Sequence, residues 1–117
     1  MKRLACALLA LILCLALAAC DLSGGTTVKV TTNGMSPLFE AGDVIRCDPV
    51  EDPQTLAVGD IIAYWIVIDG ERVSYVSRIV AIYDGEGYLL FETRDDNSAS
   101  VNPLTVHQSE IIGVYAK

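Results

Sequence analysis

The hydrophobic positions divide the chain into one long apolar run and a remainder of short alternating segments. Every residue from Leu4 to Ala19 is apolar, whereas the later segments alternate β-branched or aromatic residues with polar ones. Such alternation predicts half-buried strands, and we expect them at 28–32, 44–47, 61–68, 73–82, 88–93 and 111–115. The pair Asp69-Gly70 and the run 84–87 separate neighbouring segments as hairpin turns do. No segment after residue 20 keeps a helical period, so the pattern predicts an all-β domain.

The first twenty residues have the organisation of an export signal. Lys2 and Arg3 precede the apolar run, which ends in Leu17-Ala18-Ala19-Cys20. This ending resembles the lipobox of bacterial lipoproteins, which implies lipid attachment at Cys20 and removal of the residues before it. The alternative is an uncleaved anchor helix, because the run is at the lower length limit for spanning a bilayer. Both interpretations give a signal peptide or membrane anchor (1–20), a linker (21–27) and a β domain (28–117) on the outer face of a bacterial membrane.

Charge and cysteine content exclude two kinds of binding site. The net charge is −7 for the whole chain, and beyond Arg3 six basic side chains oppose fifteen acidic ones. A domain this acidic repels phosphate backbones, so we expect no nucleic-acid partner. Only Cys47 lies outside the first twenty residues, and we expect it to fill the core. We expect neither a metal site nor a cofactor, since the remaining cysteines lie in the leader and no paired Cys motif occurs.

Several short blocks of sequence follow one another in an order typical of one enzyme family. They are Gly34-Met35-Ser36-Pro37, Ala41-Gly42-Asp43-Val44-Ile45, Val58-Gly59-Asp60-Ile61-Ile62, Ser77-Arg78-Ile79-Val80, Thr93-Arg94-Asp95-Asp96-Asn97 and Glu110-Ile111-Ile112-Gly113-Val114. In this order they resemble type I signal peptidases of the archaeal, eukaryotic and spore-former branch. That family shows Ser-Met-x-Pro, a Gly-Asp before each of two strands, His-Arg-Ile-Val, Gly-Asp-Asn-Asn and a closing Ile-Ile-Gly. The resemblance covers residues 28–117 and implies a small signal-peptidase-like β domain of the LexA type.

The chain departs from the family pattern where the family's chemistry resides. The resemblance puts the nucleophile position at Gly34, the base position at Ser77 and an acidic position at Asn102. Glycine has no side chain that could attack a peptide bond, and a serine hydroxyl is no general base near neutral pH. Asp96 alone keeps the family's residue type. The resemblance therefore implies a signal-peptidase-like protein in which the catalytic serine and its base are replaced.

Three functional interpretations remain open from the sequence. The first is a membrane-tethered, non-catalytic protein that binds extended peptides of secreted proteins beside Met35 and Pro37, or that partners an active peptidase. The second is an active serine endopeptidase with Ser36 as a displaced nucleophile, for which the bases to consider are Lys29, Lys117 and His107. The third is a structural lipoprotein of the cell envelope.

The resemblance also gives a geometric expectation. Gly34 should lie at the end of the first strand with Ser77 and Asp96 close to it, because the family's catalytic groups must converge. Arg78 is expected to pair with Asp96 and to hold the loop that follows residue 94. The adjacent carboxylates of Asp95 and Asp96 lack the further oxygen ligands that a cation site needs.

Overall fold

Alternating residues build seven strands in the computed structural model, which describes residues 25–116 and contains no α-helix within that range. The strands are β1 (Thr26–Lys29), β2 (Val44–Asp48), β3 (Ile61–Ile68), β4 (Glu71–Asp84), β5 (Leu89–Arg94), β6 (Val106–His107) and β7 (Ile111–Tyr115). Two single-turn 3-10 helices, η1 (Pro53–Thr55) and η2 (Gln108–Glu110), connect strands. Neither of these helices is long or apolar enough to cross a membrane. The predictions for the leader, including Cys20, fall outside the described residues.

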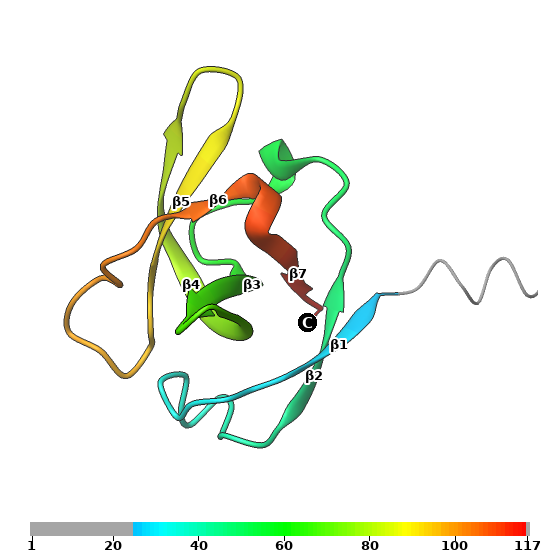
Figure 1. Cartoon of the computed structure of the whole chain (residues 1–117), viewed down its shortest axis with the longest axis vertical. Helices are drawn as coiled ribbons and strands as arrows, with labels where there is room; N and C mark the ends of the chain where they lie inside the picture. The colour runs from blue at the N-terminus through cyan, green and yellow to red at the C-terminus, as the bar shows by residue number, and fades with distance from the viewer. Residues whose placement is uncertain (1–24, 117) are drawn as a thin grey trace, which may run out of the picture.

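The strands form one antiparallel sheet in the order β1-β2-β7-β3-β4-β5-β6. Figure 1 shows the β4–β5 hairpin on one side of the molecule, β1 beside β2 on the other, and β3 and β7 between them. The predicted all-β class is therefore confirmed. Each of the six predicted strands has a counterpart, and β6 is a short addition that the pattern did not indicate.

The first strand begins and ends earlier than its pattern predicts. Thr26 and Thr27 already pair with β2, whereas Val30 lies just beyond the end of β1. The Val30 N–H donates to the Asp43 carbonyl at 2.7 Å, within the loop that leads into β2. The partner strand thus sets where β1 stops, because a local alternation carries no information about the register of its partner.

The hairpin between β3 and β4 turns at Asp69-Gly70, as predicted. Asp69 has a φ of 51° and Gly70 a φ of 81°. A two-residue turn of this kind needs positive φ at both central positions, which Asp-Gly accommodates well. The turn fixes the register of the hairpin, in which Ile68 pairs with Glu71 and each earlier residue of β3 pairs with a later one of β4.

The sheet buries one hydrophobic cluster on each of its faces. Along β3, Ala63 joins the first cluster while its neighbours Ile62 and Tyr64 join the second, as strand alternation requires. The first consists of Val28, Val30, Met35, Phe39, Ile45, Cys47, Ile61, Ala63 and Val76, and the second of Leu56, Ile62, Tyr64, Ile79, Leu89, Phe91 and Val106. Cys47 has no exposed surface, so its predicted place in the core is confirmed.

Candidate functional site

The loop after β1 and the loop after β5 meet at Gly34. The Gly34 carbonyl accepts a hydrogen bond from the Asn97 backbone N–H at 2.9 Å, and the Asn33 carbonyl accepts one from the Asn97 side-chain amide at 3.2 Å. A side chain on residue 34 would place its Cβ 2.9 Å from Cγ of Asp95, closer than carbon atoms approach each other without strain. The Asp95 carboxylate therefore fills the space that a nucleophile on residue 34 would need.

Two neutral donors hold the Asp95 carboxylate in this space. The Tyr75 hydroxyl donates to Oδ2 at 2.8 Å, and the Asn102 amide donates to Oδ1 at 3.3 Å. Burial, and then the hydrogen bond to Asp95, raises the pKa of Tyr75 to about 12. The Tyr75 phenol consequently remains a hydrogen-bond donor across the physiological pH range.

Ser77 lies behind the same loop and has no exposed surface. Its Oγ shares a hydrogen bond of 2.8 Å with the Tyr64 hydroxyl and accepts one from the Asn102 amide at 3.4 Å. Thr93, which is also fully buried, accepts a hydrogen bond from the same amide at 2.9 Å. Burial raises the pKa of Tyr64, so this hydroxyl stays neutral as well. No buried polar side-chain atom in the described part lacks a partner, and the network is closed on itself.

Three of the four family-equivalent positions therefore contribute to one cluster. Gly34 contacts Asp95, and Asn102 links Asp95 to Ser77. We expected Gly34 at the end of the first strand, but it lies in a turn beyond β1. The cluster is formed by the carboxylate, amide and hydroxyl groups of Asp95, Asn102 and Ser77, and none of these is the lysine or histidine that the family uses as a base.

Asp96 makes different contacts from the other three positions. Its two carboxylate oxygens accept parallel hydrogen bonds from Nε and Nη2 of Arg78, both at 2.9 Å. Arg78 also donates to the Gly59 carbonyl at 2.8 Å, so the expected pairing is present and connects three segments. The hydrogen bonds from Arg78 lower the pKa of Asp96 below its ordinary value of 3.8. Asp96 thus holds the 95–97 loop in place.

The turn that follows Gly34 directs its residues to different environments. Met35 is 1% exposed, and its Sδ accepts the Asp96 N–H at 3.4 Å, so a peptide beside it would meet backbone and not its side chain. Pro37 is exposed. The Ser36 Oγ donates to the Glu40 carboxylate at 2.8 Å. The hydrogen-bond partner of the candidate displaced nucleophile is therefore an acidic residue, and it is neither Lys29 nor His107.

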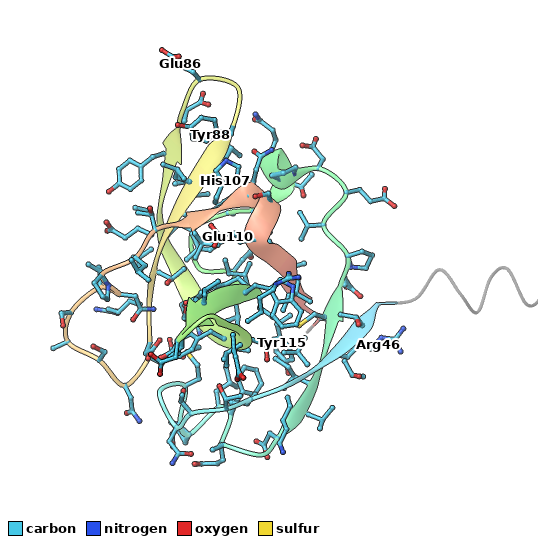
Figure 2. The ribbon with its side chains drawn as sticks, in the orientation of Figure 1. Arg46, Glu86, Tyr88, His107, Glu110 and Tyr115 are labelled. Atoms are coloured by element: carbon cyan, nitrogen blue, oxygen red, sulfur yellow. The ribbon has the colours of Figure 1, made fainter. Side chains whose placement is uncertain are left out.

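His107 makes its contacts at the β5–β6 end of the sheet. Its ring stacks on Tyr88 with centroids 4.9 Å apart, and its Nδ1 accepts the Ser109 N–H at 3.1 Å. Figure 2 shows His107 next to Tyr88, with Glu110 below them on η2. Because Nδ1 caps η2, the structural role of this histidine accounts for its position.

The site residues predicted from the sequence do not include four members of the cluster, namely Asp95, Tyr75, Tyr64 and Thr93. A signal for Asp95 was present, since matching Asp96 to the aspartate of the family's Gly-Asp-Asn-Asn block puts Asp95 at the glycine. On this resemblance, the chain has glycine where the signal peptidase pattern has serine and aspartate where that pattern has glycine. The contact between Gly34 and Asp95 makes these two exchanges sterically complementary. Within the described residues, no three His, Cys, Asp or Glu side chains are grouped as a metal site would require.

Comparisons with known proteins support the resemblance at the level of a distant relationship. No family model matches the chain. The chain is similar to signal peptidase I W of Bacillus subtilis (strain 168), with 28% identity over 92 residues, which is 79% of this chain and 47% of that protein. The chain therefore spans about half the length of the curated relative that it matches. The all-β architecture is consistent with a signal-peptidase-like β domain.

Proposed function

We propose that this protein is a signal-peptidase-like domain that binds extended peptides of exported proteins without cleaving them. The observation that carries the proposal is the packing of the Asp95 carboxylate against Gly34. A serine peptidase needs an activated hydroxyl and a base within hydrogen-bond reach. At these positions the chain has no side chain on residue 34, and at residue 77 a buried hydroxyl that is already bonded to Tyr64.

An unpaired strand edge near Gly34 supports the binding half of the proposal. The segment Arg72–Val76 of β4 pairs with β3 on one side, whereas β5 pairs with β4 only from Arg78 onward. On the free side the one hydrogen bond within the described residues runs from the Thr31 hydroxyl to the Ser74 carbonyl at 3.3 Å. An extended peptide would add to this edge, close to Met35 and Pro37, through main-chain hydrogen bonds.

A location at the outer face of the membrane completes the proposal. The similarity to a signal peptidase favours this location, and the leader provides either a lipid on Cys20 or an anchor helix. The peptides within reach would then be segments of secreted or membrane proteins, or parts of a catalytically active peptidase. Mass spectrometry of the membrane fraction tests the anchor, since a lipidated Cys20 N-terminus and an intact Met1 are mutually exclusive results.

A cleavage assay with the full-length chain in lipid nanodiscs tests the absence of catalysis. The substrate is a fluorogenic peptide with alanines one and three residues before the cut, and we expect no turnover above the rate without protein. Ser36→Ala serves as the control, because a displaced nucleophile would make any turnover depend on this hydroxyl. Robust cleavage that is lost in Ser36→Ala would overturn the proposal and establish an active serine endopeptidase.

Introducing a serine at position 34 and a base at position 77 tests whether the domain lacks only the catalytic side chains of a peptidase. Gly34→Ser alone would place the new side chain against Asp95, so the informative variant combines Gly34→Ser, Ser77→His and Asp95→Gly. General acid–base assistance contributes about 10²–10⁴-fold to a rate, so even partial recovery should be measurable. The same combination without Asp95→Gly is the matched control and should remain inactive.

A further inference from the structure

In the part of the chain that the structure describes, the outer edge of β3 is unpaired over its second half. β7 pairs with β3 only through Ile62, Ala63 and Tyr64, and the register shifts after Ala63. The segment Trp65–Ile68 therefore has β4 as its one strand neighbour within the described residues. This edge is separate from the edge of β4 considered above, since the two lie on opposite sides of the same hairpin.

The hairpin register determines which backbone groups point outward from this edge. Ile68 and Glu71 flank a two-residue turn and form a hydrogen-bonded pair, so the next pair, Val67 with Arg72, is not bonded across the hairpin. The N–H and C=O groups of Trp65 and Val67 consequently face away from β4. The same alternation directs the backbone of Ala63 to β7, where it pairs with Gly113.

A groove of about 460 Å³ runs along this edge. It is lined by Tyr64 and Ile66 of β3, by Tyr75 of β4 and by the segment 102–106. Leu104 in that segment is 68% exposed, as is Val67 on β3, so both segments present accessible apolar surface. A strand that added to the edge would direct alternate side chains into this groove.

The charges of the groove and of the domain indicate which kind of binding partner this edge favours. Among the residues that the structure describes, Glu110 is the one charged residue that lines the groove. Fifteen acidic against six basic side chains beyond Arg3 oppose the approach of a second copy of this chain. The same imbalance attracts a peptide that carries lysine or arginine.

We infer that the edge Trp65–Ile68 and its groove form a second peptide-binding site, which takes an extended segment with apolar residues at alternate positions and a basic residue beside Glu110. Main-chain hydrogen bonds to Trp65 and Val67 provide the affinity, and the groove selects the apolar side chains. This inference rests on the proposed peptide-binding function but assigns a different surface from the one beside Met35.

A pair of proline substitutions separates the two edges. Val67→Pro removes an outward N–H from β3, and Ser74→Pro removes the equivalent outward N–H from β4, so neither breaks the hydrogen bonds of the hairpin. The probe is the blocked peptide acetyl-Lys-Val-Ser-Val-Thr-Val-Lys-amide, titrated into the full-length chain in nanodiscs. Trp65 is the sole tryptophan of the chain, so its fluorescence reports binding at the edge.

Because Ser74→Pro blocks the β4 edge, the binding that remains in this variant reports the β3 edge, and we expect the addition of Val67→Pro to weaken that remaining binding by about tenfold or more, because one lost main-chain bond with a steric obstacle corresponds to that loss. Loss of all binding in Ser74→Pro alone would overturn the second site and leave the proposed function supported at the β4 edge. No binding to the unsubstituted chain would overturn the second site together with the peptide-binding half of the proposed function. A Trp65 signal that depends on protein concentration without peptide would identify a second copy as the occupant and overturn the inference.

Glu110→Gln tests the charge requirement without relying on a proline variant. The glutamine oxygen can still accept the His107 N–H, which Glu110 accepts at 2.9 Å, so η2 remains capped. We expect a two- to fivefold loss of affinity, as for about 0.5–1 kcal/mol of ion pairing, and a smaller effect at high salt. A peptide with glutamates in place of its lysines should bind the unsubstituted chain more weakly. Equal affinity for both peptides would contradict the charge assignment.

Discussion

The carboxylate of Asp95 occupies the space that any side chain on Gly34 would require. The two residues lie on different loops, and each differs from the residue type that the signal peptidase pattern has at that position. Tyr75 and Asn102 hold the carboxylate there by hydrogen bonds of 2.8 and 3.3 Å. A side chain on residue 34 and the carboxylate of Asp95 therefore compete for the same space.

Gly34→Ser should lower the free energy of unfolding by about 1–3 kcal/mol, because the new side chain displaces Asp95 from its two donors. Asp95→Gly combined with Gly34→Ser should lose less than the sum of the two single variants. Urea titrations followed by Trp65 fluorescence measure all four proteins of this double-mutant cycle. Strict additivity of the two changes would show that the residues do not compete for space.

Tyr64→Phe should destabilise the fold by about 1–3 kcal/mol, because it leaves the buried Ser77 hydroxyl without its 2.8 Å partner. Tyr83→Phe is the matched control, since Tyr83 is 49% exposed and its hydroxyl lies 3.5 Å from Glu92. The control should change the free energy of unfolding by less than about 0.5 kcal/mol. Similar values for the two variants would contradict a closed network around Ser77.

Asp96→Asn should destabilise the protein by about 1 kcal/mol at pH 7, because it removes the charge that Arg78 contacts through two hydrogen bonds. The pKa of Asp96 is lowered in the folded state, so its contribution is present above its ordinary value of 3.8 and is lost as the pH falls through the folded value. The difference between Asp96→Asn and the unsubstituted chain should therefore shrink below pH 3.8. The comparison variant is Asp84→Asn, at an exposed position, and a difference for Asp96→Asn that persists at low pH would exclude the ion pair as its source.

The Cys47 thiol should resist alkylation by iodoacetamide at pH 8 in the folded protein and react readily in urea. Burial, and then the nearby Asp48 carboxylate, raises the pKa of Cys47 to about 11 from 9.0, so the reactive thiolate is scarce in the native state. The same shift stabilises the fold below pH 9, and this contribution is lost as the pH rises toward 11. Cys47→Ala should lack the part of the stability loss at alkaline pH that comes from this thiol. Rapid labelling of the native protein would show that the core around Cys47 opens.

The strands were predictable because each depends on local alternation, while the site depends on contacts between distant segments. β3 matches its predicted bounds, and the Asp69-Gly70 turn has the backbone angles that its residues indicate. The place of Asp95 was not predictable from its own loop, because it follows from the closeness of residue 34. The sequence equally gives no sign that the tyrosine hydroxyls belong to the cluster, because a tyrosine in a strand commonly serves only as part of the hydrophobic core.

The hairpin formed by β3 and β4 has further consequences because, within the described residues, both of its outer edges are unpaired near the turn, over Trp65–Ile68 and Arg72–Val76. Backbone amides of Ile66, Ile68 and Val73 face inward and are bonded across the hairpin, whereas those of Val67 and Ser74 face outward. In deuterated solvent the inward amides should exchange slowly and the outward ones quickly, which gives a two-residue alternation of protection along each strand. A peptide strand that binds to the outer edge of β3 or of β4 would abolish the alternation along that strand of the hairpin. The alternation along the other strand of the hairpin would remain intact.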